Sequence, residues 1–119
     1  MDRIRQPFNI NRPAEAAAAA ALSDDVFLEQ SRTHVARWRP DYAECLRSAG
    51  FKPIASATNF ITFEIPAASG WTAPSFEAHL AEQGLLVRNL SNYGLPNCLR
   101  ITIGSDEDSR MALTLICNR

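Results

Sequence analysis

The chain has 119 residues, of which 46% are hydrophobic and 21% charged, and its twelve basic and thirteen acidic side chains give a formal net charge of −1. This composition is typical of one globular domain and excludes collagen-like and disordered classes, and the length leaves no room for a second, cofactor-sized domain. A nearly balanced charge provides no positive field that would hold a polyanion, so we do not expect nucleic acid as a partner.

The N-terminal end predicts a linker followed by a short helix. Residues 1–12 show no hydrophobic periodicity and read as an extended connector. Pro13 suits the first turn of a helix, and the alanines after it have the highest helix propensity, so a helix is expected over 13–22. The globular domain is therefore expected to cover residues 13–119.

A second, longer helix is expected to follow. Ser23-Asp24-Asp25 provides a cap and two acids at its start, and Gly50 ends it after Ala49. Its apolar stripe is expected to contain Phe27, Val35, Trp38, Tyr42, Leu46 and Ala49. Because proline inside a regular helix costs about 3 kcal/mol, we expect Pro40 to kink this helix or to divide it in two.

The second half of the chain predicts three strands and two helices. Apolar and polar residues alternate from Asn59 to Pro66, which predicts a half-buried strand, and the next helix is expected to end at Gly84. Residues 85–88 and 98–103 predict two more strands, which either pair directly as a hairpin or enclose another strand. Ser105 and Asp108 then resemble a capping box that opens the last helix.

The order of these elements predicts the fold class. Two helices, a strand, a helix, two strands and a final helix indicate an α+β fold with a small, mainly antiparallel sheet and helices packed on one of its faces.

Cysteine spacing and hydropathy indicate the compartment. The three cysteines, Cys45, Cys98 and Cys117, are far apart and form no C-x-x-C pair, so neither a disulfide framework nor a zinc site is expected. The alanine run at 16–21 is too short for a membrane span, and acidic residues follow it instead of a cleavage site. We therefore expect a cytoplasmic protein with no membrane partner.

Two arginines stand out as candidate ligands for an anion. Alternation in the last strand directs Leu99 and Ile101 to the core and therefore Arg100 to the opposite face. Arg88 closes the preceding strand and approaches Arg100 if the strands are neighbours. Two guanidinium groups suit a carboxylate or a phosphate, although the sequence pattern alone favours the simpler reading that both arginines only keep the outer face solvated.

Several motifs resemble one enzyme family in the same order. Leu85-Leu86-Val87-Arg88, Tyr93-Gly94-Leu95-Pro96 and Leu99-Arg100-Ile101-Thr102-Ile103-Gly104 closely resemble the end of histidinol-phosphate aminotransferases. Arg5-x-Pro7-Phe8-Asn9-Ile10-Asn11 and Asn59-Phe60-Ile61 match the same family further upstream. The resemblance spans nearly the whole chain and implies the C-terminal small domain of a fold-type-I aminotransferase that depends on pyridoxal phosphate.

The resemblance also implies roles for individual residues. Arg100 is expected to bind the carboxylate of an amino-acid substrate or the phosphate of histidinol phosphate, and Arg88 to assist at the phosphate. Tyr93, in the loop between them, is expected to help shape the pocket. Asn59 either contributes at the domain interface or at the substrate end of the site, or it only caps the start of its strand.

The chemistry of transamination is expected to lie outside this chain. The family places the Schiff-base lysine and the cofactor-binding groups on a large domain upstream. Lys52 is the only lysine and lacks the family's serine-rich context, so it reads as a solvated turn residue. We therefore expect pyridoxal phosphate in a complete enzyme but none bound by this chain alone, whose partners would be the missing large domain or a homodimer.

Two alternative functions are compatible with the sequence. Threonine-phosphate decarboxylases and aromatic aminotransferases share the carboxylate-binding arginine, but Arg88 with the loop at Tyr93 fits the histidinol-phosphate group better. A stand-alone, non-catalytic interaction module derived from an aminotransferase is the other possibility. Its second helix would then need a partner to cover its apolar surface.

Overall fold

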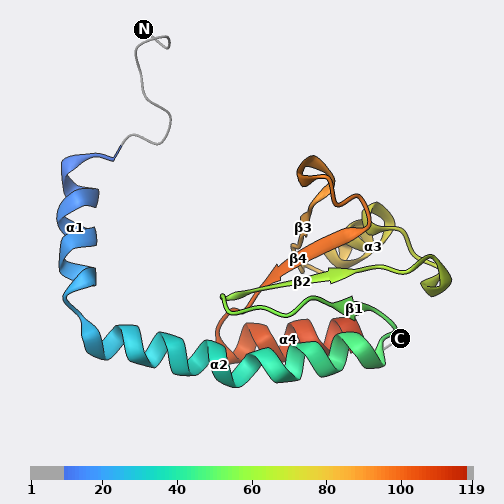
Figure 1. The fold of residues 1–119 in the computed structure, drawn as a ribbon, viewed down its shortest axis with the longest axis horizontal. Helices are drawn as coiled ribbons and strands as arrows, with labels where there is room; N and C mark the ends of the chain where they lie inside the picture. The colour runs from blue at the N-terminus through green and yellow to red at the C-terminus, as the bar shows by residue number, and fades with distance from the viewer. Residues whose placement is uncertain (1–9, 118–119) are drawn as a thin grey trace, which may run out of the picture. The chain divides into compact units, whose positions relative to one another are not determined.

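The computed structural model describes residues 10–117 and divides the chain into two compact units, residues 1–33 and residues 34–119. The first unit contains helix α1 (Arg12–Leu22) and the start of helix α2 (Asp25–Ser48), as Figure 1 shows. The second unit contains the rest of α2 and all of the sheet. Among the described residues, no helix is long and apolar enough to cross a membrane.

Helix α1 confirms the helix expected at the N-terminal end. The Asn11 side chain accepts a hydrogen bond from the Ala14 N–H (2.9 Å), and Pro13 occupies the first turn, where its missing N–H costs nothing. None of the residues of α1 is buried. Most of the expected linker, residues 1–9, lies outside the described residues, and so does most of the upstream family motif that begins at Arg5.

The first unit leaves large apolar side chains exposed, which corrects one expectation. Phe27 was expected on the buried stripe of the second helix, but it is 64% exposed. Leu22, Val26 and Leu28 are exposed as well. Within its own unit, no described element packs against this surface, whereas the stripe from Val35 onward lies against the core of the second unit.

Helix α2 runs unbroken through Pro40, so the expected division into two helices is wrong. Pro40 and Ala36 are both exposed, so water can reach the Ala36 carbonyl that loses its helical hydrogen bond. The helix ends as expected, because Gly50 adopts a φ of +80° and the Phe51 N–H bonds the Leu46 carbonyl at 2.8 Å.

The sheet has four antiparallel strands in the order β1-β2-β4-β3, which are labelled in Figure 1. The strands are β1 (Lys52–Pro53), β2 (Phe60–Glu64), β3 (Arg88–Asn89) and β4 (Cys98–Thr102). Of the two arrangements left open by the sequence, the direct pairing of β3 with β4 is the observed one. Strand β1 was not predicted from the sequence. The strand expected over residues 85–88 is mostly wrong, because residues 85–87 are not part of the sheet and only Arg88 joins β3.

The two remaining helices are held by side-chain caps. Thr72 and Ser75 form a reciprocal capping box at the start of α3 (Ala73–Glu82). Ser105 and Asp108 do the same at α4 (Asp106–Cys117), as the sequence predicts, because the Asp108 N–H donates to Ser105 Oγ and the Ser105 N–H to Asp108 Oδ2. Short 3-10 turns occupy Ala67–Ser69 and Ser91–Tyr93.

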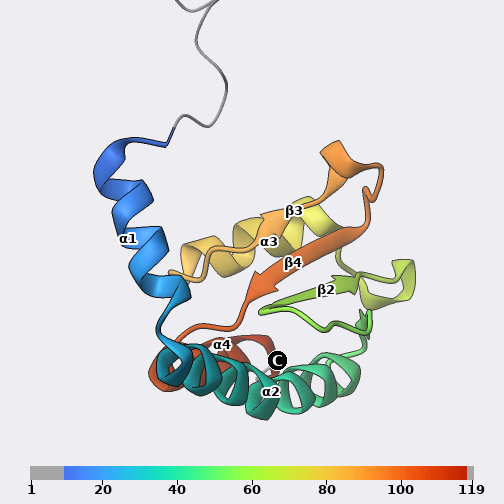
Figure 2. The ribbon, with the colours of Figure 1, turned by 60° about the vertical axis from the view of Figure 1, so that its left-hand side comes forward.

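Helices cover one face of the sheet, which confirms the predicted α+β class. Figures 1 and 2 show α4 beside the second part of α2. Residues from α2, α3, α4 and both central strands form one buried cluster, whose largest fully buried side chains are Tyr42, Leu46, Phe63, Leu80, Leu99 and Ile116. The odd-numbered residues of β2 and β4 enter this core, as period-two alternation requires.

One expectation about the cysteines is wrong. The structure pairs Cys45 on α2 with Cys117 at the end of α4, with their Cα atoms 5.8 Å apart. Sequence spacing did not indicate this pair because the partners are 72 residues apart and meet only when the two helices pack side by side. Cys98 is a buried free thiol.

Candidate functional site

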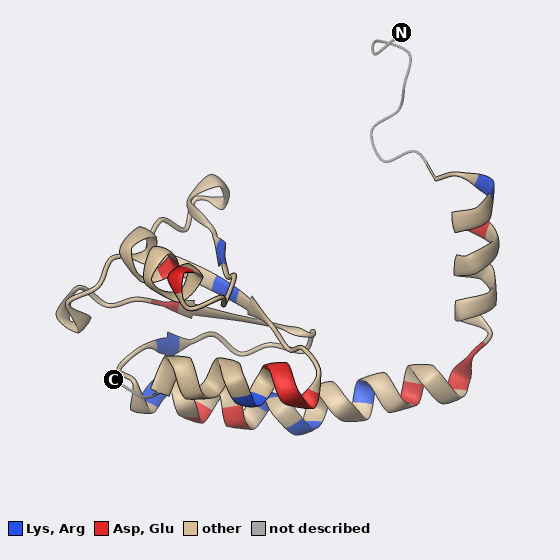
Figure 3. Ribbon diagram, turned by 180° about the vertical axis from the view of Figure 1, so that it is seen from behind, with Lys and Arg blue, Asp and Glu red and all other residues tan. Residues whose placement is uncertain are grey.

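The register of the sheet brings Arg88 and Arg100 together. The two residues are direct cross-strand partners on β3 and β4, so their side chains leave the sheet on the same face. Leu99 and Ile101, on either side of Arg100, are buried in the core, so this face is the one opposite the helices. Figure 3 shows the basic segments of the two strands next to each other. Arg100 is half-buried and Arg88 is exposed.

An aromatic ring lies beneath each guanidinium group. The Cζ atom of Arg100 is 4.2 Å from the centre of the Phe60 ring. The Cζ atom of Arg88 is 5.6 Å from the centre of the Tyr93 ring, and its Nη2 donates a hydrogen bond to Tyr93 Oη at 3.1 Å. Cation–π contacts orient a guanidinium without occupying its N–H groups. Most donors of both arginines therefore stay available to a ligand.

A tight turn after β3 places Tyr93 under Arg88. The Asn89 Oδ1 accepts hydrogen bonds from the Ser91 N–H at 2.9 Å and from Ser91 Oγ. This Asx turn opens the 3-10 turn, and Gly94, with a φ of +77°, closes it. The Asn89 amide also donates to Glu77 on α3 (3.2 Å), so the turn is tied to the helix layer.

No carboxylate neutralises the two arginines within the described part of the chain. Glu64 is the acidic residue of β2 on this face, and it pairs with Lys52 on β1 at 3.5 Å. Like charges directly opposite each other on neighbouring strands destabilise a sheet. An anion bound between Arg88 and Arg100 would therefore relieve repulsion as well as gain charge-assisted hydrogen bonds.

The other neighbours on this face of the sheet add no negative charge. Thr62 on β2 is the cross-strand partner of Arg100 and contributes a neutral hydroxyl. Burial raises the pKa of the Cys98 thiol, and the nearby Glu64 carboxylate raises it further, so the thiol stays neutral. The arrangement can thus hold a phosphate or a carboxylate, but among the residues described here it presents no base or nucleophile activated for chemistry.

Asn59 does not join this group. It precedes β2, and its carbonyl accepts a hydrogen bond from the Ile103 N–H at 2.9 Å, which extends the ladder beyond the strand end. Thr62, three residues further along the chain, is the β2 residue opposite Arg100. The structure therefore brings together Arg88, Arg100 and Tyr93 but leaves Asn59 at the sheet end, and its role remains a prediction.

Sequence reasoning missed Phe60 as part of the site. The alternation of β2 was the available signal, because it places Phe60 on the same face as Thr62 and Glu64. An aromatic residue on an otherwise polar face needs a partner, and here the partner is Arg100.

The surroundings of Lys52 do not fit pyridoxal phosphate. A Schiff-base lysine must lie in a pocket with an acid that pairs with the pyridine nitrogen and with groups that hold the cofactor phosphate. Lys52 lies on the short strand β1, is 66% exposed and is paired with Glu64. Arg88 and Arg100 are on other strands and are not assembled around it.

Comparison with known proteins gives one consistent family. Residues 1–116 match the family model described as Aminotransferase class I and II. Histidinol-phosphate aminotransferase 1 of Caulobacter vibrioides is 47% identical over 116 residues, which are 98% of this chain and 32% of that protein. The histidinol-phosphate aminotransferase of Nitrobacter hamburgensis is 43% identical over 93% of this chain and 30% of its own length. The chain thus spans about a third of the length of these relatives.

Solved structures of whole aminotransferases contain the same fold. The histidinol-phosphate aminotransferase of Sinorhizobium meliloti, solved in complex with pyridoxal-5'-phosphate, superposes with a TM-score of 0.66 at 26% identity and covers 98% of this chain and 32% of that one. The Clostridium acetobutylicum enzyme of the same name gives a TM-score of 0.79 at 22% identity over 98% of this chain and 35% of that one, which shows the shared fold.

Proposed function

The chain belongs to the class I and II aminotransferase family, and we propose that it is the substrate-binding small domain of a histidinol-phosphate aminotransferase. The observation that carries this proposal is the pair Arg88 and Arg100, which are direct cross-strand partners without a carboxylate among the described residues. The enzyme would exchange an amino group between histidinol phosphate and 2-oxoglutarate.

The geometry of the two arginines supports a different role for each in binding the acidic group of the substrate. Arg100 is half-buried and held on Phe60, so it has the fixed orientation that a bidentate contact to a carboxylate or phosphate requires. Arg88 is exposed and held by Tyr93, and it would add the second charge that a dianionic phosphate needs. Because the amino acceptor and histidinol phosphate must use one site in turn, two guanidinium groups can serve both.

We place the amino-transfer chemistry outside this chain. Pyridoxal phosphate, when bound to a complete enzyme of this family, supplies the electron sink for amino transfer. The residues of this chain would bind the acidic group of the substrate and orient its amino group towards that cofactor. The single lysine, Lys52, is exposed and paired with Glu64 and takes no part in this proposal.

The exposed apolar residues of the first unit support the view that another part of a larger protein covers them. Leu22, Val26 and Phe27 are 84%, 70% and 64% exposed. Neighbouring apolar side chains on one segment usually mark a surface that another part of the protein covers. We propose that the remaining two-thirds of an aminotransferase chain covers them, and not a second copy of this chain alone.

A chimera tests the proposed function. The last third of the Caulobacter vibrioides enzyme would be replaced by this chain, and steady-state rates would be measured with histidinol phosphate and 2-oxoglutarate. We expect the chimera to transaminate. Arg100→Gln should raise KM for both substrates by about 10- to 100-fold, the value of one lost charge-assisted contact, with the cofactor absorbance unchanged. Arg88→Gln should act mainly on histidinol phosphate.

Two results would count against this function. An active chimera whose KM values do not respond to Arg100→Gln would show that the acidic group binds elsewhere. A chimera that prefers aromatic amino acids or releases carbon dioxide from a phosphorylated amino acid would favour the aromatic aminotransferases or the threonine-phosphate decarboxylases. Lys52→Gln is the matched control, and we expect it to leave the rates unchanged.

A further inference from the structure

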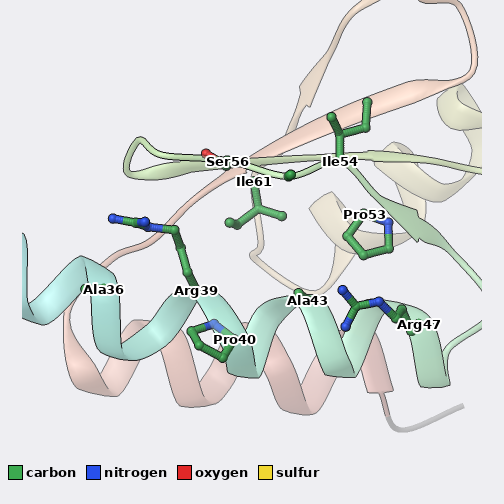
Figure 4. Close-up of a pocket in the computed structure, with 10 residues that line it drawn as sticks. Ala36, Arg39, Pro40, Ala43, Arg47, Pro53, Ile54, Ser56 and Ile61 are labelled. Carbon is green, nitrogen blue, oxygen red and sulfur yellow. The ribbon is translucent and has the colours of Figure 1, made fainter.

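A concave surface lies on the helix side of the sheet, away from Arg88 and Arg100. A groove with a volume of about 400 Å³ separates α2 from the segment that follows β1 (Figure 4). Arg39, Ala43 and Arg47 line it from α2, and Pro53 and Ile54 face them from the other side. This volume is in the range of small-molecule sites.

The guanidinium of Arg39 carries an unsatisfied donor at this groove. Its Nε is buried and has no hydrogen-bond partner, and no ion pair to Arg39 is found among residues 10–117. Figure 4 shows the side chain stretched from α2 towards the opposite wall. Because the Nε atom itself is buried, an anion in the groove would bind the terminal Nη groups of the same guanidinium.

Arg47 provides a second positive charge further along the same helix. It lies eight residues after Arg39, which corresponds to about 12 Å along a helix axis. Glu44 contacts the Arg47 guanidinium at 3.6 Å, but the Glu44 side chain is 80% exposed and does not line the groove. The described lining contains no aspartate or glutamate, so the groove is positively charged.

The groove between the two arginines is apolar. Ala43 on α2 and Pro53 and Ile61 on the opposite wall contribute only carbon to it. The Ser56 hydroxyl also lines the groove, but it already donates a hydrogen bond to the Phe60 carbonyl at 2.6 Å. The methyl side chain of Ala43 leaves the space open, since a larger residue at this position would fill it. An occupant therefore needs acidic groups at its ends and an aliphatic middle.

We propose that this groove binds a small organic dianion, an aliphatic chain with a carboxylate at each end, one held by Arg39 and the other by Arg47. The site is separate from the proposed substrate site, because Ile61 belongs to the buried face of β2 whereas Arg100 lies on the opposite face of the sheet. The proposal does not depend on the catalytic function of a complete enzyme.

Calorimetric titration of the full 119-residue chain tests the proposal with octanedioate, octanoate and succinate as probes. We expect octanedioate to bind most tightly, because octanoate lacks the second acid and succinate is too short to reach both arginines. Arg39→Gln should weaken octanedioate binding at least tenfold, and Arg47→Gln should weaken it less. Arg110→Gln, an exposed substitution on α4, is the matched control and should not change it.

Ala43→Leu gives an independent test that leaves both charges in place. The added side chain should abolish octanedioate binding by filling the groove, while circular dichroism shows an unchanged fold. The proposal is overturned if octanedioate shows no binding at concentrations on the order of 10 mM, about tenfold above the Kd of a millimolar site. It is equally overturned if binding survives Arg39→Gln but is lost in Arg100→Gln, since the dianion would then occupy only the outer face of the sheet.

Discussion

The two faces of the sheet use alternate residues of the same strands for different purposes. On the inner face, Phe63 and Leu99 are fully buried against the helices. On the outer face, Phe60 and Thr62 lie beside Arg100, which has no acidic partner among the described residues. In the proposed function, the residues for stability and those for ligand binding are therefore separated by single steps along β2 and β4.

The inner face determines where the outer arginines lie. A shift of β4 by one residue against β2 would turn Leu99 outward and Arg100 into the core, at the cost of a buried charge. The apolar inner residues thus fix the register, and the register makes Arg88 and Arg100 direct neighbours. Substitutions on the inner face should consequently lower mainly the stability of the domain, and substitutions on the outer face should lower mainly anion binding.

The largest effect is expected on the inner face. Phe63→Ala removes a fully buried ring that contacts Phe51, at a ring-centre distance of 5.5 Å. Deletion of a buried phenylalanine side chain costs about 3–5 kcal/mol. Urea unfolding followed by circular dichroism should show this loss. A loss below about 1 kcal/mol would mean that the inner face does not carry the stability of the domain.

The next effect is expected on the outer face and only on binding. Arg100→Gln should weaken phosphate binding to the chain by about 10- to 100-fold, because a charge-assisted hydrogen bond is lost. Its unfolding free energy should change by less than about 1 kcal/mol, because the substitution also removes the repulsion from Arg88. If Arg100→Gln unfolds the domain, the two faces are not independent.

A smaller effect should follow from removal of the ring beneath Arg100. Phe60→Leu keeps an apolar side chain but loses the cation–π contact at 4.2 Å. A partly exposed contact of this kind contributes about 0.5–1 kcal/mol, so phosphate binding should weaken about two- to fivefold. Phe60→Tyr retains the ring and should bind phosphate as tightly as the wild-type chain. Equal binding by the leucine and tyrosine variants would show that Phe60 does not position Arg100.

The smallest effect is expected on the pH dependence of stability, at a polar cluster of Trp38, Arg37 and Asp106. The Trp38 indole donates a hydrogen bond to Asp106 Oδ1 at 2.7 Å and holds the pKa of Asp106 below its ordinary value, with Arg37 adding to the effect. A lowered carboxyl pKa stabilises the fold above the unfolded-state pKa of about 4, and this contribution is lost as the pH falls.

Thermal unfolding measured between pH 7 and pH 3 checks this contribution. The wild-type melting temperature should fall more steeply below about pH 4 than that of Asp106→Asn, which has no proton to gain at this position. Asp41→Asn is the matched control, because Asp41 is exposed and lies on α2, whereas Asp106 begins α4. Parallel curves for wild type and Asp106→Asn would exclude Asp106 as a source of pH-dependent stability.

Much of the fold could be predicted from capping residues and from the spacing of apolar residues along the chain. The expectations that were wrong, at Pro40 and at the cysteines, have physical causes. Capping residues and alternation predicted both ends of α2, the start of α4 and the inward face of β4. Local signals could not predict the continuity of α2, because the cost of Pro40 depends on whether the carbonyl four residues earlier is buried or hydrated. They could not predict the Cys45–Cys117 pair either, because it forms through packing of two distant helices.

The candidate site was predictable only where it depends on local alternation and not on the pairing of strands. Alternation placed Arg100 on the outer face, but only the register of β3 against β4 makes Arg88 its direct partner. The contact of Arg100 with Phe60 required the pairing of β2 with β4, which no local pattern specifies. Asn59 was proposed from a motif, and the structure gives it a backbone hydrogen bond at the end of β2.

The most direct test is a titration of the isotope-labelled chain with inorganic phosphate, followed by amide chemical shifts in two-dimensional NMR spectra. We expect saturable shifts concentrated at Arg88, Tyr93 and Arg100, and we expect these shifts to disappear in Arg100→Gln while the core signals of Phe63 and Leu99 keep their positions. Shifts at the two arginines that persist in Arg100→Gln, or that never saturate, would contradict the assignment of the outer face as the anion-binding site.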